Sequence, residues 1–381
     1  GVEVRREGMV LGSITVQHFL ASYPRLAGMT ATAVPAAEEL HSTYELRVVV
    51  IPPHRRCRRI DHDDRIFSHR EAKESSLVEE ISRVHRQGRP VLVGTASVAE
   101  SEALSSRLEA AAVPCQVLNA KQDQREAEVI AEAGAVGAVT ISTNMAGRGT
   151  DIRLGGRRQT ECDRVVELGG LYVIGTNRHE SLRVDRQLRG RAGRQGDPGS
   201  SRFFISLEDP LIERYGIAEL LPARQRQVRR RDPISSPVVR RTIATGQRIV
   251  EGESFAIRRR LWRYSELMDR QRSWMQTRRR SLLRGDKKPA LLRRRCPEPW
   301  AAALEKVGED GLSEIERRIT LLMIDRCWSD YLALMTSVRD GIHVVGLVGK
   351  DPLAEFYRET GEAFEDLQVR VEEAVVETFG R

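Results

Sequence analysis

The sequence predicts an α/β domain built on a parallel sheet, followed by an all-α region. Between Pro90 and Asp209, short apolar segments alternate with amphipathic ones, a pattern typical of a parallel sheet covered by helices. After Pro237 the apolar residues recur every three or four positions, which indicates long helices instead. The chain of 381 residues is too long for one ordinary core, so two or three domains are expected.

The predicted sheet contains five strands with helices between them. One helix is predicted over 97–111, where Ser97 is a good N-cap, and another over 123–134. The stretch 187–199 supplies a turn and a helix before the last strand. The strands are predicted over residues 90–95, 115–120, 137–143, 169–176 and 201–209.

Three helical segments are predicted after the sheet. The first begins at Pro237 and covers about 45 residues, or roughly 65 Å at 1.5 Å per residue, a length that suits a scaffold. Further apolar series run over 315–335 and 353–374. Asp351 is a good N-cap and Pro352 a good first helical residue, so a loop is predicted to join two antiparallel helices.

Positive charge is concentrated in the middle of the chain. Residues 221–300 hold 23 basic and 7 acidic groups, a net charge of +16, whereas residues 1–220 are neutral and residues 301–381 carry a net charge of −8. Such a block can attract nucleic acid, anionic lipid or an acidic protein face. A solvated arginine face beside an acidic partner helix is an equally open interpretation.

The sequence predicts no metal site and no membrane span. The five cysteines lie far apart without a Cys-x-x-Cys pair, and the eight histidines show no ligand spacing, so reduced thiols and no zinc are expected. No run of about 18 apolar residues occurs, and the N-terminus lacks a signal pattern. A cytoplasmic protein is therefore expected.

The first candidate functional motif, TNMAGRGTDIRLGG, follows the third predicted strand. Open α/β sheets bind ligands at this place, beyond the carboxyl ends of their strands. Gly147 and Gly149 permit left-handed backbone and close approach of a ligand, and Arg148 adds positive charge. Asp151 can hold a hydroxyl, a water or a metal-bound water.

The second motif, QLRGRAGRQG, carries Arg191 and Arg194 on the helix before the last strand. Guanidinium groups aimed at a γ-phosphate stabilise charge in phosphoryl transfer, with effects on the order of 10³ to 10⁵ in rate. The sequence has no G-x-x-x-x-G-K-[ST] motif and no apolar strand that ends in Asp-Glu. We therefore expect arginine fingers that act on a nucleotide held by another domain.

These motifs resemble the C-terminal part of the SecA family, the ATPase motors of bacterial preprotein translocation. Three further stretches carry the resemblance, LVGTASVAESEALS, NAKQDQREAEVIAEAG and GGLYVIGTNRHES, and it covers essentially the whole chain. The resemblance implies an α/β RecA-like second motor domain of the P-loop NTPase type, followed by an all-α scaffold with a two-helix finger. Residues 13–33 are similar to the last helix and coupling strand of the first motor domain.

The same resemblance implies five segments. They are a remnant of the first RecA-like motor domain (1–35), the second RecA-like nucleotide-binding domain (36–218), a long scaffold helix (219–284), a reduced wing (285–311), and the two-helix finger with the end of the scaffold (312–381).

The resemblance also implies roles for the residues of the first motif. Asp151 resembles the carboxylate that contacts nucleotide, and Arg148 resembles the coupling arginine beside it. Gly147, Gly149 and Thr150 belong to the same cofactor-binding loop.

Five further residues take their expected roles from the resemblance or from their position. Arg191 and Arg194 resemble the catalytic arginines that face the γ-phosphate, and Gln187 would help to couple the two motor domains. Leu347 lies at the expected tip of the finger, where a large apolar side chain can contact polypeptide. His179 follows a strand and is expected to have a structural or interdomain role.

At the level of function, the resemblance implies a part of the motor that couples ATP binding and hydrolysis to moving preproteins. ATP with Mg²⁺ would be held mainly by the first motor domain, so this chain is not expected to hydrolyse ATP alone. The implied partners are a SecYEG-type channel, unfolded preproteins and an anionic lipid surface, with a homodimer left open and nucleic acid not expected. The protein would be peripheral on the inner face of the cell membrane.

Two other classes of function remain open on the sequence. A superfamily 2 RNA or DNA helicase fragment would share the arginine-glycine core and use the basic block. A non-catalytic translocation adaptor would follow from the missing P-loop. The sequence also leaves open a housekeeping or an accessory SecA paralogue, and a fragment, a split protein or a degenerate copy.

Overall fold

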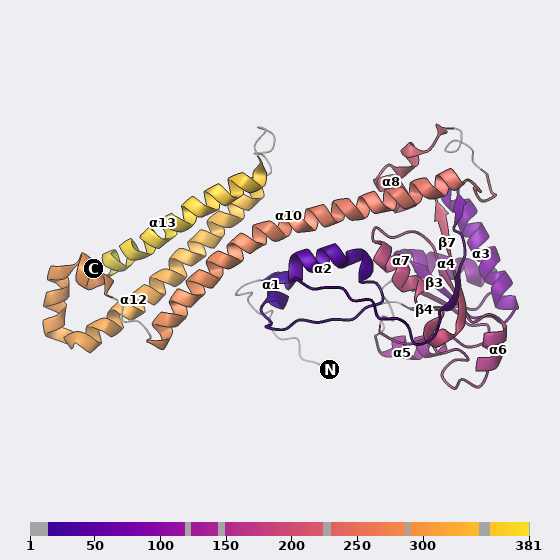
Figure 1. The fold of residues 1–381 in the computed structure, drawn as a ribbon, viewed down its shortest axis with the longest axis horizontal. Coiled ribbons are helices and arrows are strands. Elements are labelled where there is room, and N and C mark those ends of the chain that lie inside the picture. Colours follow the sequence, from indigo (N-terminus) through magenta and orange to yellow (C-terminus); the bar gives the residue numbers. More distant parts are fainter. Residues whose placement is uncertain are drawn as a thin grey trace. The chain divides into compact units, whose positions relative to one another are not determined.

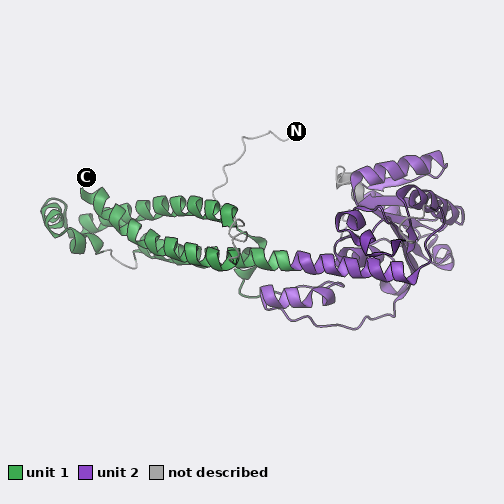
Figure 2. Cartoon of the chain, turned by 90° about the horizontal axis from the view of Figure 1, so that it is seen from above, with its two compact units in different colours: residues 1–26, 256–381 green, residues 27–255 purple. Residues whose placement is uncertain are grey.

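The computed structural model describes residues 14–118, 123–143, 149–223, 230–285, 290–342 and 351–380 (Figure 1). The chain divides into two compact units, coloured separately in Figure 2. The α/β unit contains residues 27–255, and the helical unit contains residues 1–26 and 256–381. Helix α10, Pro237–Arg284, contributes its first part to the α/β unit and the remainder to the helical unit.

A parallel sheet forms the centre of the α/β unit. Within the described residues it has seven strands in the order β1-β7-β6-β3-β5-β4, and β2 pairs with the part of β7 that follows its pairing with β1. Because every pair is parallel, the carboxyl ends of the strands lie at one edge. The strands are β1 Arg58–Asp61, β2 Arg65–Phe67, β3 Val91–Thr95, β4 Gln116–Leu118, β5 Val139–Thr143, β6 Leu171–Gly175 and β7 Pro198–Ser206.

Helices cover both faces of the sheet because successive side chains of each strand point to opposite faces. On β3, for example, Leu92 joins one core cluster, while Val91 and Val93 join the other. The first cluster is completed by α5, α6, α7, α8 and the start of α10, and the second by α3 and α4. These helices are α3 Arg70–Arg86, α4 Val98–Ala110, α5 Asp123–Glu132, α6 Cys162–Glu167, α7 Leu182–Arg189 and α8 Pro210–Arg214.

The structure confirms the parallel α/β sheet and the described parts of all five predicted strands. It also contains β1, β2 and α3, which the sequence analysis did not predict. The inner face of α3 includes Lys73 and Glu80, which are only 4% and 5% exposed and interrupt the apolar pattern. The edge strand β1 carries charged residues at most positions, so it lacks the alternation typical of a strand.

The N-terminal residues form a helix but not the expected strand. Helix α1, Val16–Ala21, lies within the segment predicted to contain a helix. The prediction of a coupling strand within residues 13–33 is wrong for this structure, because residues 22–33 are all described and contain no strand. No strand of the sheet pairs with this segment, and a strand needs such a partner for its backbone groups.

In the helical unit, α10, α12 and α13 pack together. Their shared cluster contains Met275 of α10, Tyr331 of α12 and Leu367 of α13, all buried. Figure 1 shows α12 and α13 side by side and running in opposite directions. The short helix α11 packs against both through Leu292. The bounds are α11 Leu291–Arg295, α12 Pro297–Gly341 and α13 Pro352–Gly380.

The long first helix of the all-α region is confirmed, since α10 spans 48 residues. Asp351 is confirmed as an N-cap, because its Oδ1 accepts a hydrogen bond of 3.0 Å from the Leu353 backbone. Helix α12 begins well before the apolar series that starts at Ile315 and so takes in much of 285–311. Gly308 interrupts it with φ 77° and ψ 167°.

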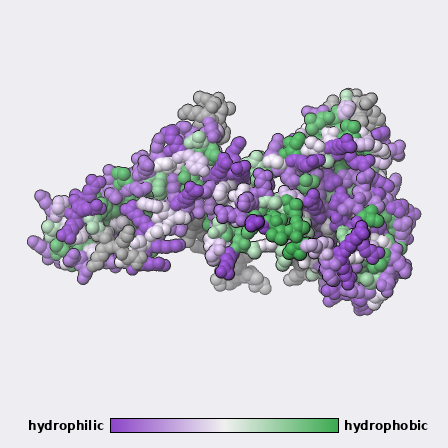
Figure 3. All heavy atoms as spheres, viewed as in Figure 1, coloured by the Kyte–Doolittle hydropathy of each residue, from purple (hydrophilic) through white to green (hydrophobic). Residues whose placement is uncertain are grey.

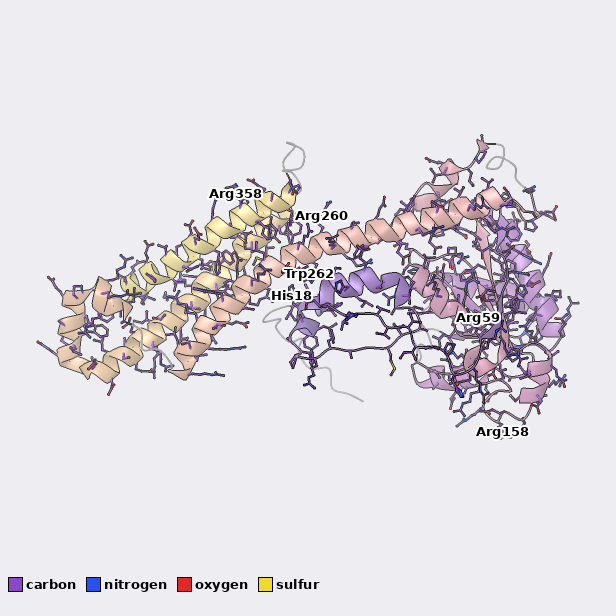
Figure 4. The ribbon with its side chains drawn as sticks, viewed as in Figure 1. His18, Arg59, Arg158, Arg260, Trp262 and Arg358 are labelled. Carbon is purple, nitrogen blue, oxygen red and sulfur yellow. The ribbon has the colours of Figure 1, made fainter. Side chains whose placement is uncertain are left out.

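Helix α1 packs on α10 through aromatic rings. The rings of His18 and Trp262 are stacked with centroids 6.1 Å apart, and both are labelled in Figure 4.

Figure 3 shows a mostly hydrophilic surface on the face in view. Across the described ranges, no helix is long and apolar enough to cross a membrane.

Candidate functional site

The candidate site is formed by the loop that follows β5 and carries Thr150 and Asp151. It lies at the amino edge of the sheet, where the chain enters β1 and β7, and not beyond the carboxyl end of β5 as the sequence analysis expected. This loop returns onto the turn after α5, where the Gly155 backbone donates a hydrogen bond of 2.8 Å to the Gly134 carbonyl. A Cβ atom at Gly134 would lie 2.0 Å from the Arg153 carbonyl oxygen. Glycine is therefore required there for the loop to lie so close to the sheet.

Helix α7 brings the two arginines to the same place. Ser181 caps the helix by accepting a hydrogen bond of 3.3 Å from the backbone two residues on. After the helix ends, the chain turns at Gly193 with φ +70°, and a Cβ there would lie 2.6 Å from the Arg59 Cβ. This tight turn carries Arg191 and Arg194 on either side of the glycine.

The two guanidinium groups converge on the loop after β5. Nη1 of Arg191 and Nη1 of Arg194 each donate to the Thr150 carbonyl, both at 3.3 Å. Arg194 Nη1 also lies 2.7 Å from Asp151 Oδ1, and its Nε donates to the Gly190 carbonyl at 3.1 Å. The structure thus brings together four residues that the sequence assigned to the site.

The ion pair of Arg194 and Asp151 is accessible from solvent. Their side chains are 33% and 53% exposed. An exposed pair contributes little to stability, on the order of 0 to 1 kcal/mol, so a ligand anion can replace the carboxylate at small cost.

A cleft of about 580 Å³ opens beside this ion pair. The extended chain before β1 forms its other wall, a feature that the sequence analysis did not predict. Arg55 Nη1 reaches the Gln195 carbonyl at 3.4 Å, and Gln195 has φ +52°, a conformation uncommon outside glycine. The basic run PPHRRCRR is the feature of the sequence that could have indicated this wall. The cleft is lined by Pro53, His54, Arg55, Cys57, Asp151, Gly193, Arg194, Gln195 and Gly196.

Other predicted site residues lie elsewhere or cannot be placed. Gln187 is half-buried on α7 and does not line this cleft. Gly149 has φ +92°, in keeping with the left-handed backbone expected of it. Gly147, Arg148 and Leu347 lie outside the described residues.

A buried ionic network lies behind the arginine-bearing turn. The guanidinium of Arg178 donates to Asp64 Oδ2 at 2.5 Å and to Asp185 Oδ2 at 3.1 Å. Burial disfavours its charged form, but Asp64 and Asp185 outweigh that effect and raise the pKa of Arg178. Arg189 adds a hydrogen bond of 3.0 Å to Ser201 Oγ. The sequence analysis did not predict this network, because its members come from four separate segments.

The chemistry of the cleft favours an anion. Two guanidinium groups that reach one carbonyl oxygen can bind two oxygens of one phosphate group. Asp151 offers a single carboxylate, and no group of three or more His, Cys, Asp or Glu side chains among the described residues could hold a metal ion. The two guanidinium groups thus suit an anion with several oxygens, such as a phosphate group.

Comparison with protein families gives three matches along the chain. The SecA P-loop domain model matches residues 56–163 and 157–227. The SecA wing and scaffold domain model matches residues 233–296 and 290–381, and the SecA DEAD-like domain model matches residues 1–41.

The chain is also similar to curated proteins named protein translocase subunits. It is 48% identical over 358 residues to SecA 2 of Thermobifida fusca, a match covering 94% of this chain and 46% of the relative. It is 46% identical to SecA 3 of Mycolicibacterium vanbaalenii, over all of this chain and 49% of the relative. With SecA 2 of Mycobacterium tuberculosis strain H37Rv the identity is 45%, over all of this chain and 46% of the relative. The chain spans about half the length of these relatives.

Proposed function

The chain belongs to the SecA family, and we propose that it supplies the second, arginine-bearing half of a motor that uses ATP to move preproteins. The observation that carries this proposal is the convergence of Arg191 and Arg194, in the turn before β7, on Thr150 in the loop after β5. The names of the relatives, protein translocase subunits, support the same role.

In this proposal the arginines act as fingers on the γ-phosphate of ATP. Bound ATP supplies the phosphoryl group whose transfer to water releases energy. Arg194 leaves Asp151 and, with Arg191, donates to phosphate oxygens, where it stabilises the charge that develops during transfer. Asp151 is then free to accept from a nucleotide hydroxyl or from a metal-bound water.

The nucleotide and its Mg²⁺ are held mainly by a first motor domain, because this chain has no G-x-x-x-x-G-K-[ST] motif. We propose that the part of each relative not matched by this chain contains that domain. By itself the chain does not hydrolyse ATP. Residues 36–218 then form the second RecA-like domain, and residues 1–35 complete the end of the first.

We assign the rest of the chain to the transport of polypeptide. In the scaffold segment 219–284 the long helix is α10, which begins at Pro237 and not at 219, residues 285–311 are a reduced wing, and residues 312–381 hold a two-helix finger made of α12 and α13. Leu347, between these helices, would contact unfolded preprotein at the mouth of a SecYEG-type channel. The antiparallel packing of α12 on α13 supports this assignment.

The arginines of the helical unit favour an anionic lipid surface. Arg279 is paired with Asp325 at 2.8 and 3.1 Å, but Arg293, Arg294 and Arg295 are exposed on α11. We propose that the protein works in the cytoplasm, peripheral on the inner face of the membrane. Binding to vesicles with anionic lipid should then weaken as salt rises, and binding that salt leaves unchanged would contradict it.

The decisive experiment measures ATP turnover by this chain alone and after mixing with the unmatched half of the Thermobifida fusca relative. Turnover is expected only in the mixture and should be lost with Arg194→Ala. Arg158→Ala is the matched control, because Arg158 is an exposed arginine of the loop that carries Asp151 and does not line the cleft. No turnover from folded and associated halves would favour a non-catalytic adaptor, and stimulation by RNA instead of preprotein would favour a helicase.

A further inference from the structure

Helix α10 begins in the α/β unit, where it is fixed to the first core cluster. Val239, Ile243 and Val250 are buried in the same cluster as Leu188 of α7. A Cβ atom at Gly246 would lie 2.7 Å from the nearest Ile217 side-chain atom, so the helix backbone lies directly against that side chain. The start of α10 thus has one packed position beside α7.

A single polar side chain of α10 enters this contact. Gln247 is 2% exposed, and its Nε2 donates to the His179 carbonyl at 2.7 Å and to Asp185 Oδ2 at 2.8 Å. A side-chain amide nitrogen has two hydrogens, so these two acceptors use both. The contribution of His179 to this contact comes from its backbone carbonyl.

Asp185 is the point at which three segments meet. It lies in the first turn of α7, is 3% exposed, and accepts from the His179 backbone at 3.0 Å and from Arg178 Nη1 at 3.1 Å, in addition to Gln247. Beside it, Ser181 Oγ, at the cap of α7, donates to Glu251 of α10 at 3.0 Å. Two consecutive turns of α10 are thus hydrogen-bonded to the beginning of α7.

Helix α7 continues directly into the turn that carries the arginine pair. The Gly190 and Arg191 backbones donate to the carbonyls of Arg186 and Leu188, so the helical turn extends to the first arginine. Any rotation of α7 about its own axis would therefore move Arg191 and Arg194. Asp185 and Gln247 oppose that rotation from one side of the helix.

We propose that Gln247 is a positioning residue through which α10 sets the orientation of α7 and, with it, the two arginines of the cleft. Its importance for turnover rests on the proposed function. Without its amide, the His179 carbonyl and Asp185 would each lose a donor in a buried place, where an unsatisfied group is costly. Helix α7 would then fluctuate while the sheet behind it keeps its own contacts.

Amide hydrogen exchange of the chain alone tests this without nucleotide. Gln247→Met keeps the size of the side chain but removes its donors, and it should speed exchange in α7 by about tenfold or more while β3 and β6 stay within about twofold. Gln247→Asn keeps the amide on a side chain one methylene shorter and should give the same change in exchange. It replaces Gln247→Met in the test if that variant does not fold. Gln271→Met is the matched control, because Gln271 is a buried glutamine of the same helix that bonds Tyr331 and Thr360 instead.

Three outcomes would overturn the proposal. They are α7 exchange within about twofold of the parent, equal acceleration of α7 and β3, and the same α7 change in Gln271→Met.

A second arm measures turnover in the mixture with the relative's unmatched half. Because Gln247 does not line the cleft, Gln247→Met should lower kcat by about tenfold and leave KM within about twofold. An unchanged kcat would overturn the positioning role. A parent mixture without turnover would count against the proposed function only, and the exchange arm would still decide on Gln247.

Discussion

Arg194 donates to Asp151 across 2.7 Å, although the two residues are 43 positions apart and lie in different loops, one before β7 and the other after β5. The pair closes one side of the cleft, and both side chains keep contact with solvent. In this structure the Asp151 carboxylate accepts a hydrogen bond from the guanidinium that we propose to act on phosphate. The same carboxylate competes with a phosphate for that guanidinium, so the two partners should respond differently to substitution.

Arg194→Ala should lower ATP turnover of the mixed halves by about 10³ and leave the stability of the chain within about 1 kcal/mol. Arg194→Lys should restore little, because an ammonium group cannot replace the planar fork of arginine. Initial rates at saturating ATP, with thermal unfolding of each variant, provide the measurement. Turnover by Arg194→Ala equal to that of Arg158→Ala would contradict a finger role.

A buried ion pair offers a test of stability in the α/β unit. Lys73 Nζ lies 2.5 Å from Asp209 Oδ1 and donates to the Thr176 carbonyl at 2.9 Å, and both charged side chains are at most 5% exposed. Lys73→Met leaves a buried carboxylate without its partner and should cost about 3 to 5 kcal/mol of unfolding free energy. Adding Asp209→Asn should recover part of this loss, because the uncompensated charge disappears.

The tryptophans provide an internal control for that measurement. All four, at positions 262, 274, 300 and 328, belong to the helical unit. The unfolding transition followed by tryptophan fluorescence should therefore keep the urea midpoint of the parent. The transition of the α/β unit, followed by circular dichroism, should shift to a lower urea midpoint. If the unfolding free energy of the double variant falls by the sum of the losses measured for Lys73→Met and for Asp209→Asn alone, the two charges do not stabilise each other.

The sequence predicted the strands that are buried on both faces because such strands are continuous apolar runs. It did not predict β1, whose residues are mostly exposed and charged, or α3, where charged residues face the interior and are compensated by groups elsewhere in the chain. Glu80, for instance, receives hydrogen bonds from Arg83 on its own helix and from Tyr172 on β6. Local periodicity cannot reveal a partner 92 positions away.

For the candidate site, sequence motifs identified the arginines and Asp151 but not the second wall of the cleft. Arg55 reaches that wall from a segment with no periodic pattern, and only the tertiary structure brings it beside Gln195. Gln247 was likewise hidden, because a glutamine in a long amphipathic helix gives no sign of its partner. Residues that position a site carry a weaker sequence signal than residues that contact a ligand.

Two glycines of the α/β unit should respond to alanine in opposite directions. Gly193 has φ +70°, and an added Cβ would lie 2.6 Å from the Arg59 Cβ, so Gly193→Ala should cost about 1 to 3 kcal/mol. Gly252 lies within α10 with no atom within 4 Å of an added Cβ. Gly252→Ala should stabilise the chain by about 0.5 to 1 kcal/mol, because alanine is the better helix former.

Urea unfolding of both variants provides the comparison, and turnover in the mixture adds a second readout. Gly193→Ala should also reduce turnover, because the turn that presents Arg194 is displaced, whereas Gly252→Ala should leave turnover unchanged. If Gly193→Ala is as stable and active as the parent, the left-handed turn is not required for the site.

Asp61 should make the stability of the α/β unit depend on pH in the acid range. Burial alone would raise its pKa, but hydrogen bonds from Arg59 at 2.8 and 2.9 Å and from Ser201 at 2.6 Å outweigh burial and lower the pKa to about 2. A carboxyl whose pKa is lower in the folded state stabilises that state above its unfolded pKa, near 3.8, and loses this contribution as pH falls towards 2.

Because the Asp61 side chain is 39% exposed, solvent screening reduces this contribution to about 1 kcal/mol. Asp61→Asn should therefore destabilise the α/β unit by about that amount at pH 7 and by almost nothing at pH 2, so the two unfolding curves converge on acidification. Asp63→Asn, at a side chain 80% exposed, should change stability by less than about 0.5 kcal/mol at either pH. The contribution of the Asp61 negative charge disappears when the carboxyl is protonated. If the difference in unfolding free energy between Asp61→Asn and the parent stays constant from pH 7 to pH 2, Asp61 therefore acts through the shape of its contacts and not through its charge.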